Sequence, residues 1–170
     1  MAANASVRQS FFTALTETSS TDKEGVGTLR TDQFGNVYRW VKNEETSDVP
    51  VVGQAVFHLL SNGPTMTQTI QTCATADLGV MAGLVMATTL PALYYGWVQV
   101  IGYHATGVVS NATNVTITAG CFLKGVNAAT YMLLDAATQA SYKRNVQILE
   151  AVATAQTPAA TTKKMYVNCL

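Results

Sequence analysis

The middle of this chain is nearly free of ionic side chains. Residues 49–123 contain one formal charge, Asp77, whereas residues 1–48 carry seven acidic and five basic side chains. The remaining charges run from Lys124 to Lys164. A middle this poor in charge would be a sticky surface if it were all exposed. We therefore expect most of it to form a core and part of it to face a partner.

The uncharged run from Leu78 to Tyr103 is long enough to cross a bilayer as a helix. It is interrupted by Pro91 and by glycines at positions 79, 83, 96 and 102, and no basic flank sets an orientation. Short apolar runs punctuated by Gly and Pro are typical of strands in a β-barrel or sandwich core. We expect buried strands here and no membrane partner.

Two strands should organise the fold. Tyr94–Tyr103 alternates, with Trp97, Gln99, Ile101 and Tyr103 on one face and Val98 and Val100 on the other. A turn-rich interval follows, and Thr116–Leu123 is expected to be a second strand that enters a turn at Gly120.

A hairpin is predicted before them. Val26–Arg30 and Val37–Lys42 flank a turn in which Gly35 and Asn36 both tolerate positive φ. Alternation should place Val37, Arg39 and Val41 on one face, and Tyr38 and Trp40 on the other.

Later segments complete the expected sheet. Strands are predicted over Pro50–Phe57, Val146–Val152 and Lys163–Leu170, with a loop over Thr154–Thr162. Residues 127–144 have high helix propensity, but Tyr131–Leu134 also reads as a buried strand followed by a loop, which we favour slightly.

The fold class that follows is mainly β. Residues 25–170 are predicted to form a single small β-rich domain, either a β-barrel, a β-tulip-like fold or a sandwich. Residues 1–24 are polar around Phe11 and Phe12, and we interpret them as an extended N-terminal arm whose two phenylalanines anchor on a neighbour. The alternative is a terminal strand that docks on its own domain.

Aromatic side chains are the candidate binding residues. Tyr38, Trp40 and Trp97, with Phe11 and Phe12, are the candidate interface residues, and Tyr38, Trp40, Trp97 or Tyr103 would be stacking surfaces if a sugar were bound. Cross-strand core packing is the more frequent role of such aromatic pairs.

Catalytic and metal-binding signatures are not apparent. His58 and His104 have no Asp, Glu or Cys at ligand spacing, so we expect satisfied strand histidines. Cys73, Cys121 and Cys169 form no Cys-x-x-Cys pair and are interpreted as structural thiols. We expect no enzyme activity, no cofactor and no metal. A net charge of zero also argues against a nucleic-acid partner.

The order of segments resembles the decoration (cement, head-stabilising) proteins of tailed bacteriophages. The resemblance covers roughly residues 27–170, and its segments are Phe34–Lys42, Pro50–Val56, Tyr95–Gly102, Val115–Leu123, Gln147–Ala151 and the closing strand. It implies a non-enzymatic virion structural protein, made in the host cytoplasm, that binds the outside of a capsid and stabilises the shell. The implied partners are the phage major capsid protein and further copies of this chain, with a homotrimer favoured. A carbohydrate-binding head or tail component is the alternative.

Overall fold

The computed structural model describes residues 11–44, 49–58, 69–71, 80–110, 116–125, 132–134, 146–153 and 160–169. Within these ranges the chain forms strands and no helix, so no helix there is long and apolar enough to cross a membrane. The strands are β1 (Thr18–Ser19), β2 (Leu29–Thr31), β3 (Val37–Asn43), β4 (Ala55–His58), β5 (Thr69–Gln71), β6 (Met81–Val85), β7 (Tyr95–Ser110), β8 (Phe122–Gly125), β9 (Met132–Leu134), β10 (Val146–Ile148) and β11 (Ala160–Asn168).

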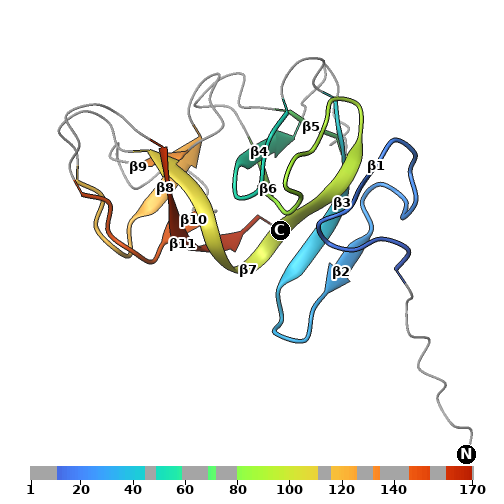
Figure 1. Cartoon of the computed structure of the whole chain (residues 1–170). Helices are drawn as coiled ribbons and strands as arrows, with labels where there is room; N and C mark the ends of the chain where they lie inside the picture. The colour runs from blue at the N-terminus through green and yellow to red at the C-terminus, as the bar shows by residue number, and fades with distance from the viewer. Residues whose placement is uncertain are drawn as a thin grey trace, which may run out of the picture.

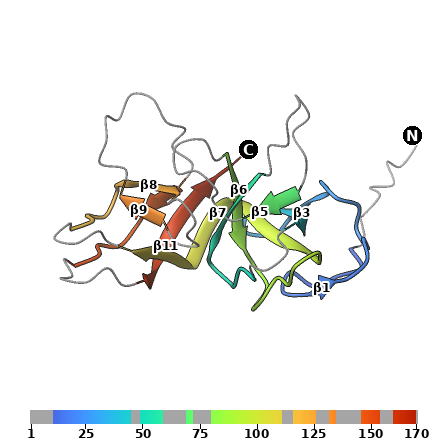
Figure 2. The same ribbon diagram turned by 90° about the horizontal axis from the view of Figure 1, so that it is seen from above.

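Strand β7 is the longest element and runs through the middle of the molecule (Figure 1). Its first half pairs with β1, β3 and β6, and its second half pairs with β9. Strand β11 pairs with the part of β7 that runs from Ile101 to Ser110. The remaining strands therefore lie in two groups, one on each side of β7, as Figure 2 shows from above.

In each group, successive strand pairings start at β7 and end at β7 again. One path runs through β6, β4, β5 and β3, and the other through β9, β8, β10 and β11. Each path contains one short parallel pairing. Strands β3 and β5 share two register pairs, and β7 and β9 share one. The prediction of a mainly β domain is confirmed, and the arrangement is consistent with a sandwich-like domain. A closed barrel is not confirmed.

The alternation predicted for β3 is confirmed. Val37 and Val41 pack with Val56, Val85 and other small apolar side chains of β4, β6 and β7, whereas Tyr38 and Trp40 pack with Trp97 on the opposite face. Successive side chains of a strand point to opposite faces, so a single strand contributes to two separate clusters.

The predicted β2–β3 hairpin is also confirmed, but its turn differs from the prediction in one respect. Gly35 has φ 82°, as expected, whereas Asn36 does not have a positive φ, since Leu93 is the only described non-glycine residue that does. Asn36 has a tertiary role instead. Its Oδ1 accepts a hydrogen bond from the Tyr103 backbone N–H at 3.0 Å, and this bond ties the hairpin turn to β7.

The turn-rich interval expected after Tyr103 is wrong over its first residues, because β7 continues to Ser110. Pairing with β11, from Tyr103↔Tyr166 to Ser110↔Ala160, supplies the backbone partners that keep this stretch extended. Residues 160–162, expected in a loop, therefore belong to β11. The far side of the interval, residues 111–115, lies outside the described residues.

The second organising strand is also shorter than predicted. The turn predicted at Gly120 is confirmed, with φ 89° at this glycine, but the segment before it is an isolated bridge of Ile117 with Val152, and β8 begins after the turn at Phe122. The Cys121 backbone N–H closes this turn by donating to the Thr118 carbonyl. Strand β9 agrees with the strand expected over Tyr131–Leu134, and most of residues 127–144 lie outside the described part of the chain.

The largest hydrophobic cluster draws on both groups of strands. Phe57 and Leu84, from β4 and β6, belong to the same cluster as Met132, Ile148 and Met165, from β9, β10 and β11. The described part of the uncharged middle therefore contributes many core residues, and the two groups of strands share both β7 and a set of buried side chains.

Candidate functional site

The candidate interface aromatics Trp40 and Trp97 face each other in the interior. They are register partners on β3 and β7, their ring centroids lie 5.2 Å apart at 61°, and both side chains are fully buried. Tyr95 stacks on Trp40 with centroids 6.4 Å apart, and Phe11 meets the Trp97 ring edge-on at 5.6 Å. Such geometries are preferred by aromatic pairs in protein cores.

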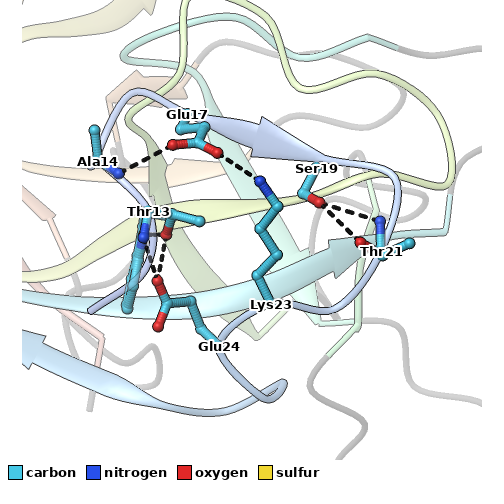
Figure 3. A network of polar contacts seen from close by, with 8 residues as sticks. Thr13, Ala14, Glu17, Ser19, Thr21, Lys23 and Glu24 are labelled. Carbon is cyan, nitrogen blue, oxygen red and sulfur yellow. Dashed lines mark hydrogen bonds and ion pairs between the residues drawn. The ribbon is translucent and has the colours of Figure 1, made fainter. Parts of the chain in front are cut away.

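Residues 11–24, which we call the N-terminal strap, cover this aromatic cluster. Strand β1 within the strap pairs with β7, as Thr18↔Gly96 and Ser19↔Tyr95. Figure 3 shows the polar contacts that hold the strap in shape: Glu24 accepts hydrogen bonds from both the backbone N–H and the hydroxyl of Thr13, at 2.6 Å each. In the same view Glu17 bridges the Ala14 N–H and the Lys23 ammonium.

The strap also satisfies both indole N–H groups. Trp97 Nε1 donates to Thr13 Oγ1 at 2.9 Å, and Trp40 Nε1 donates to Asp22 Oδ1 at 2.9 Å. An indole N–H that is buried without a partner is costly, so these two bonds match the strap to this particular pair of tryptophans. Arg30 adds a further tie, because its guanidinium donates to the Thr13 carbonyl and lies 5.1 Å from the centre of the Phe11 ring.

Tyr38 is held inside the same cluster. Its hydroxyl donates to Asp32 Oδ2 at 2.9 Å. Burial, and then the neighbouring Asp32 carboxylate, raise the pKa of Tyr38 to about 12, so the phenol stays neutral at any physiological pH.

The sequence-predicted interface residues therefore separate into two sets. Tyr38, Trp40 and Trp97 are core residues, and the core-packing alternative describes them correctly. Phe11 is partly buried against Trp97 of its own chain. This agrees with the alternative prediction, in which the N-terminal segment docks on its own domain. Phe12 is 79% exposed and remains available to a partner. Residues 1–10 lie outside the described residues, so an arm over that part stays a prediction.

His58 lies beside Arg39, and Arg39 in turn lies near Cys169. The Arg39 guanidinium is 3.4 Å from His58 Nε2, and since Arg can only donate, this nitrogen accepts. Burial lowers the pKa of Arg39, and burial raises the pKa of the nearby Cys169 thiol to about 12, so this cysteine is an inert thiol. Cys121 is also a free thiol, and Cys73 lies outside the described residues.

His104 is buried in a separate place, on the second half of β7. Its Nδ1 lies 2.7 Å from Gln99 Oε1, and Gln99 Nε2 donates to the carbonyls of Ile101 and Tyr103. Gln99 Oε1 is thus an acceptor, which places the proton of the neutral imidazole on Nδ1. Burial lowers the pKa of His104 to about 4. Within the described ranges, no three His, Cys, Asp or Glu side chains gather as a metal site would require.

Six charged side chains within the described residues form three ion pairs near the surface. Lys42 bonds Glu44 at 2.8 Å, Lys23 bonds Glu17 at 2.9 Å, and Lys164 bonds Glu150 at 2.9 Å. Exposed pairs of this kind contribute little stability.

Most of the exposed apolar side chains are surface features that sequence reasoning missed. Phe12 and Tyr103 are exposed and were sequence candidates; the other large hydrophobic side chains exposed within the described residues are Leu29, Phe34, Val49, Val52, Leu93, Tyr94, Leu149 and Tyr166. Phe34 is 80% exposed at the tip of the β2–β3 turn. A signal existed for Phe34, because a phenylalanine between turn residues has no strand partner to cover it. No local signal identified Leu93.

The comparisons with known proteins add no relative: no family model, no curated protein and no solved structure matches this chain.

Proposed function

We propose that this chain is a non-enzymatic structural protein of a bacteriophage virion that binds the outside of the capsid and stabilises the shell. The proposal starts from the resemblance to phage decoration proteins in the order of segments between residues 27 and 170. Its partners would be the major capsid protein and further copies of this chain, with a trimer favoured.

The observation that carries the proposal is the kind of surface this chain presents. Large apolar side chains remain exposed, led by Phe34 and Phe12 at 80% and 79%, on a chain in which charged residues make up only 12%. Charged side chains normally keep a free monomer soluble. A surface that combines few charges with exposed aromatic residues favours a protein that functions while bound to other subunits.

The stabilising effect would need no chemistry. A protein that binds the assembled shell and not its separated subunits shifts the equilibrium toward the assembled state by mass action. Burial of apolar side chains against the shell would supply the binding free energy, at about 25 cal/mol for each Å² of apolar surface removed from water.

The test compares virions that contain this protein with virions that lack it. Both preparations are heated and then exposed to osmotic shock, and intact particles are counted by infectivity and by electron microscopy. We expect markedly fewer intact particles when the protein is missing. Equal survival of the two preparations would exclude the stabilising role.

The carbohydrate-binding alternative has less support. Three of its four candidate stacking residues, Tyr38, Trp40 and Trp97, have at most 5% of their surface exposed. Tyr103, at 47% exposed, would have to act without them. A glycan would need an open aromatic face, which these three buried side chains do not offer.

A further inference from the structure

The N-terminal strap, residues 11–24, is closed on itself by its own hydrogen bonds. Thr13 and Glu24, near its two ends, are joined by two bonds of 2.6 Å, and Glu17 bonds both the Ala14 N–H and the Lys23 ammonium (Figure 3). The Glu17 N–H also donates to the Ala14 carbonyl at 3.1 Å. The strap is therefore a compact loop that can move as a unit.

The attachment of the strap to the other strands is specific but small. Strand β1 contributes two register pairs with β7, and the indole N–H groups of Trp40 and Trp97 donate to strap oxygens. Phe11 and Leu15 of the strap pack against the same aromatic cluster. Figures 1 and 2 both show the strap, in blue, at one edge of the molecule beside β3. The whole strap can thus leave this face without disturbing the strands beneath it.

The face under the strap is matched to a strap and is incomplete without one. Trp40 and Trp97 are fully buried, so removal of the strap would bring part of this aromatic surface into water, which is unfavourable. Thr13 Oγ1 and Asp22 Oδ1 stand where the two indole N–H groups need acceptors, at 2.9 Å each. A strap from any other copy of this chain carries the same groups at the same spacing and fits equally well.

The connection between the strap and β2 is a turn that contains two glycines. Gly25 and Gly27 have φ of 83° and 95°. Thr28 closes the turn, because its N–H donates to the Gly25 carbonyl at 3.0 Å and its hydroxyl donates to the Glu24 carbonyl at 2.7 Å. Positive φ turns the strap back onto its own chain, whereas an extended connection, with negative φ, would carry it away. Glycine adopts both conformations, so this turn is the place where the chain can open.

We propose that the strap exchanges between copies of this chain, so that the strap of one copy covers the Trp40 and Trp97 rings of another. Exchange of an identical element is a low-cost route to self-association, because the exchanged contacts reproduce those of the closed form and only residues 25–27 change. One site then serves both interpretations of the N-terminal segment, docking on its own domain and anchoring on a neighbour. The inference rests on the function proposed above only for its expectation that copies of this chain associate.

The first experiment asks whose strap covers each site, and it uses the register pair Ser19↔Tyr95. Register partners on antiparallel strands have Cα atoms about 4.5–5.5 Å apart, which is within the span of a disulfide. Ser19→Cys protein is incubated at high concentration with Tyr95→Cys protein and then oxidised. We expect a disulfide-linked pair with one chain of each kind, and mass spectrometry of the joined peptides distinguishes this bond from bonds of the native cysteines.

The double variant Ser19→Cys/Tyr95→Cys is the positive control. In dilute solution it should form the same bond within one chain, which shows that the substituted protein folds and that the two thiols meet. If the double variant forms this bond and the mixed single variants do not, exchange is excluded.

The second experiment strains the connection in its closed form. Gly25→Ala places a Cβ at positive φ, with only an ordinary contact of 3.5 Å to the Thr28 hydroxyl, so its effect is conformational. An extended connection removes this strain. We expect the association constant, measured by light scattering over a range of concentrations, to rise about thirtyfold, because a reciprocal pair relieves two residues and each contributes about a factor of five.

Gly35→Ala is the matched control. Gly35 has φ 82° and open space around it, but its turn, between β2 and β3, is the same in the closed and exchanged forms. We expect this variant to associate within about twofold of the wild type, since a strain that is present in both forms does not shift the equilibrium between them.

The remaining outcomes are also decisive. Equal association of the two alanine variants, or a single-chain mass for both at the highest concentration, would overturn the inference. Oligomers that form without a bond between residues 19 and 95 of different chains would show that copies meet through another surface, which overturns it as well. These measurements use purified protein without shells, so their failure leaves the capsid function to its own test by heat and osmotic shock.

Discussion

At the scale of single residues, the interior pairs nearly all of the polar groups that it contains. The indole N–H groups of Trp40 and Trp97 and the Tyr38 hydroxyl each have a partner. Among the buried side-chain nitrogen and oxygen atoms of the described residues, His104 Nε2 is the one that lacks a hydrogen bond. With the proton on Nδ1, this nitrogen is an acceptor, and the thioether of Met165, in register with His104 on β11, has no hydrogen to donate to it.

His104 should make the stability of the protein depend on pH. Because burial lowers the pKa of its folded form to about 4, from an ordinary value of 6.5, the unfolded chain binds a proton in this window and the folded protein does not. The free energy of unfolding should therefore fall as the pH decreases from 6.5 to 4. The loss should reach about 3 kcal/mol, at 1.36 kcal/mol per pKa unit.

Urea unfolding at several pH values checks this prediction, with His104→Gln as the comparison. The variant cannot ionise at this position, so its stability should change less over the same window, while the effect of the carboxylates is common to both proteins. Parallel pH profiles for the two proteins would contradict the prediction.

At the scale of elements, the N-terminal strap shows how a short, irregular segment is fixed in place. Strand β1 contributes only two register pairs to its attachment. The other attachments are side-chain hydrogen bonds, and Thr13 makes several of them. Its hydroxyl accepts from the Trp97 indole N–H, and its hydroxyl and backbone N–H both donate to Glu24. The Thr13 carbonyl accepts from Arg30 as well.

Replacement of Thr13 by valine should loosen the strap. Valine has nearly the same shape but no hydroxyl, so the Trp97 N–H loses its acceptor in a buried place, and we expect a loss of about 1–3 kcal/mol in the free energy of unfolding. Tryptophan fluorescence should shift toward that of a more exposed indole. Thr16→Val, on an exposed residue of the same strap, is the control and should change stability by less than about 0.5 kcal/mol. Equal effects of the two substitutions would show that the hydroxyl of Thr13 is unimportant.

At the scale of the whole molecule, β7 makes the two groups of strands interdependent. The turn before β4 reinforces this connection across the shared strand. Gly53, in this turn, donates from its N–H to the Val85 carbonyl of β6, and its carbonyl accepts from the Val108 N–H in the second half of β7. A Cβ on Gly53 would overlap the Thr106 carbonyl oxygen, so this close approach requires glycine.

Unfolding should consequently be a single cooperative transition. Trp40 and Trp97 report on one side of β7 by fluorescence, and far-ultraviolet circular dichroism reports on all strands, so the two probes should give coincident urea curves. Gly53→Ala should shift both curves together, by more than about 2 kcal/mol, through a clash with backbone and a positive φ.

Gly35→Ala is the matched control for this prediction. Gly35 has nearly the same φ, 82° against 79°, but has open space around it, so only the conformational cost of about 1 kcal/mol applies. Two separated transitions, or equal effects of the two alanines, would contradict the interdependence of the two groups.

Local patterns in the sequence account for much of this fold. Alternation in Val37–Lys42 predicted which side chains share a face, and Gly35 marked the hairpin turn, because strand periodicity and positive φ act over a few neighbouring residues. The near absence of charge across residues 49–123 predicted a core, since ions are costly to bury, and the apolar runs punctuated by Gly and Pro predicted that this core is built from strands. The capsid function remains a proposal that rests on resemblance and on surface character.

Contacts between distant residues decided the rest. Alternation along β3 predicted which face Trp40 lies on, but not whether that face meets solvent or a partner. In the structure it packs against Trp97 and the strap. The sequence after Tyr103 has no strong strand signal, yet β11, some sixty residues later, holds it extended by backbone hydrogen bonds. Leu93 has its unusual φ because Asn43, from β3, fixes the turn around it. Residue type thus determines what each segment tolerates locally, and the segments that meet across the fold determine which of those options has the lowest free energy.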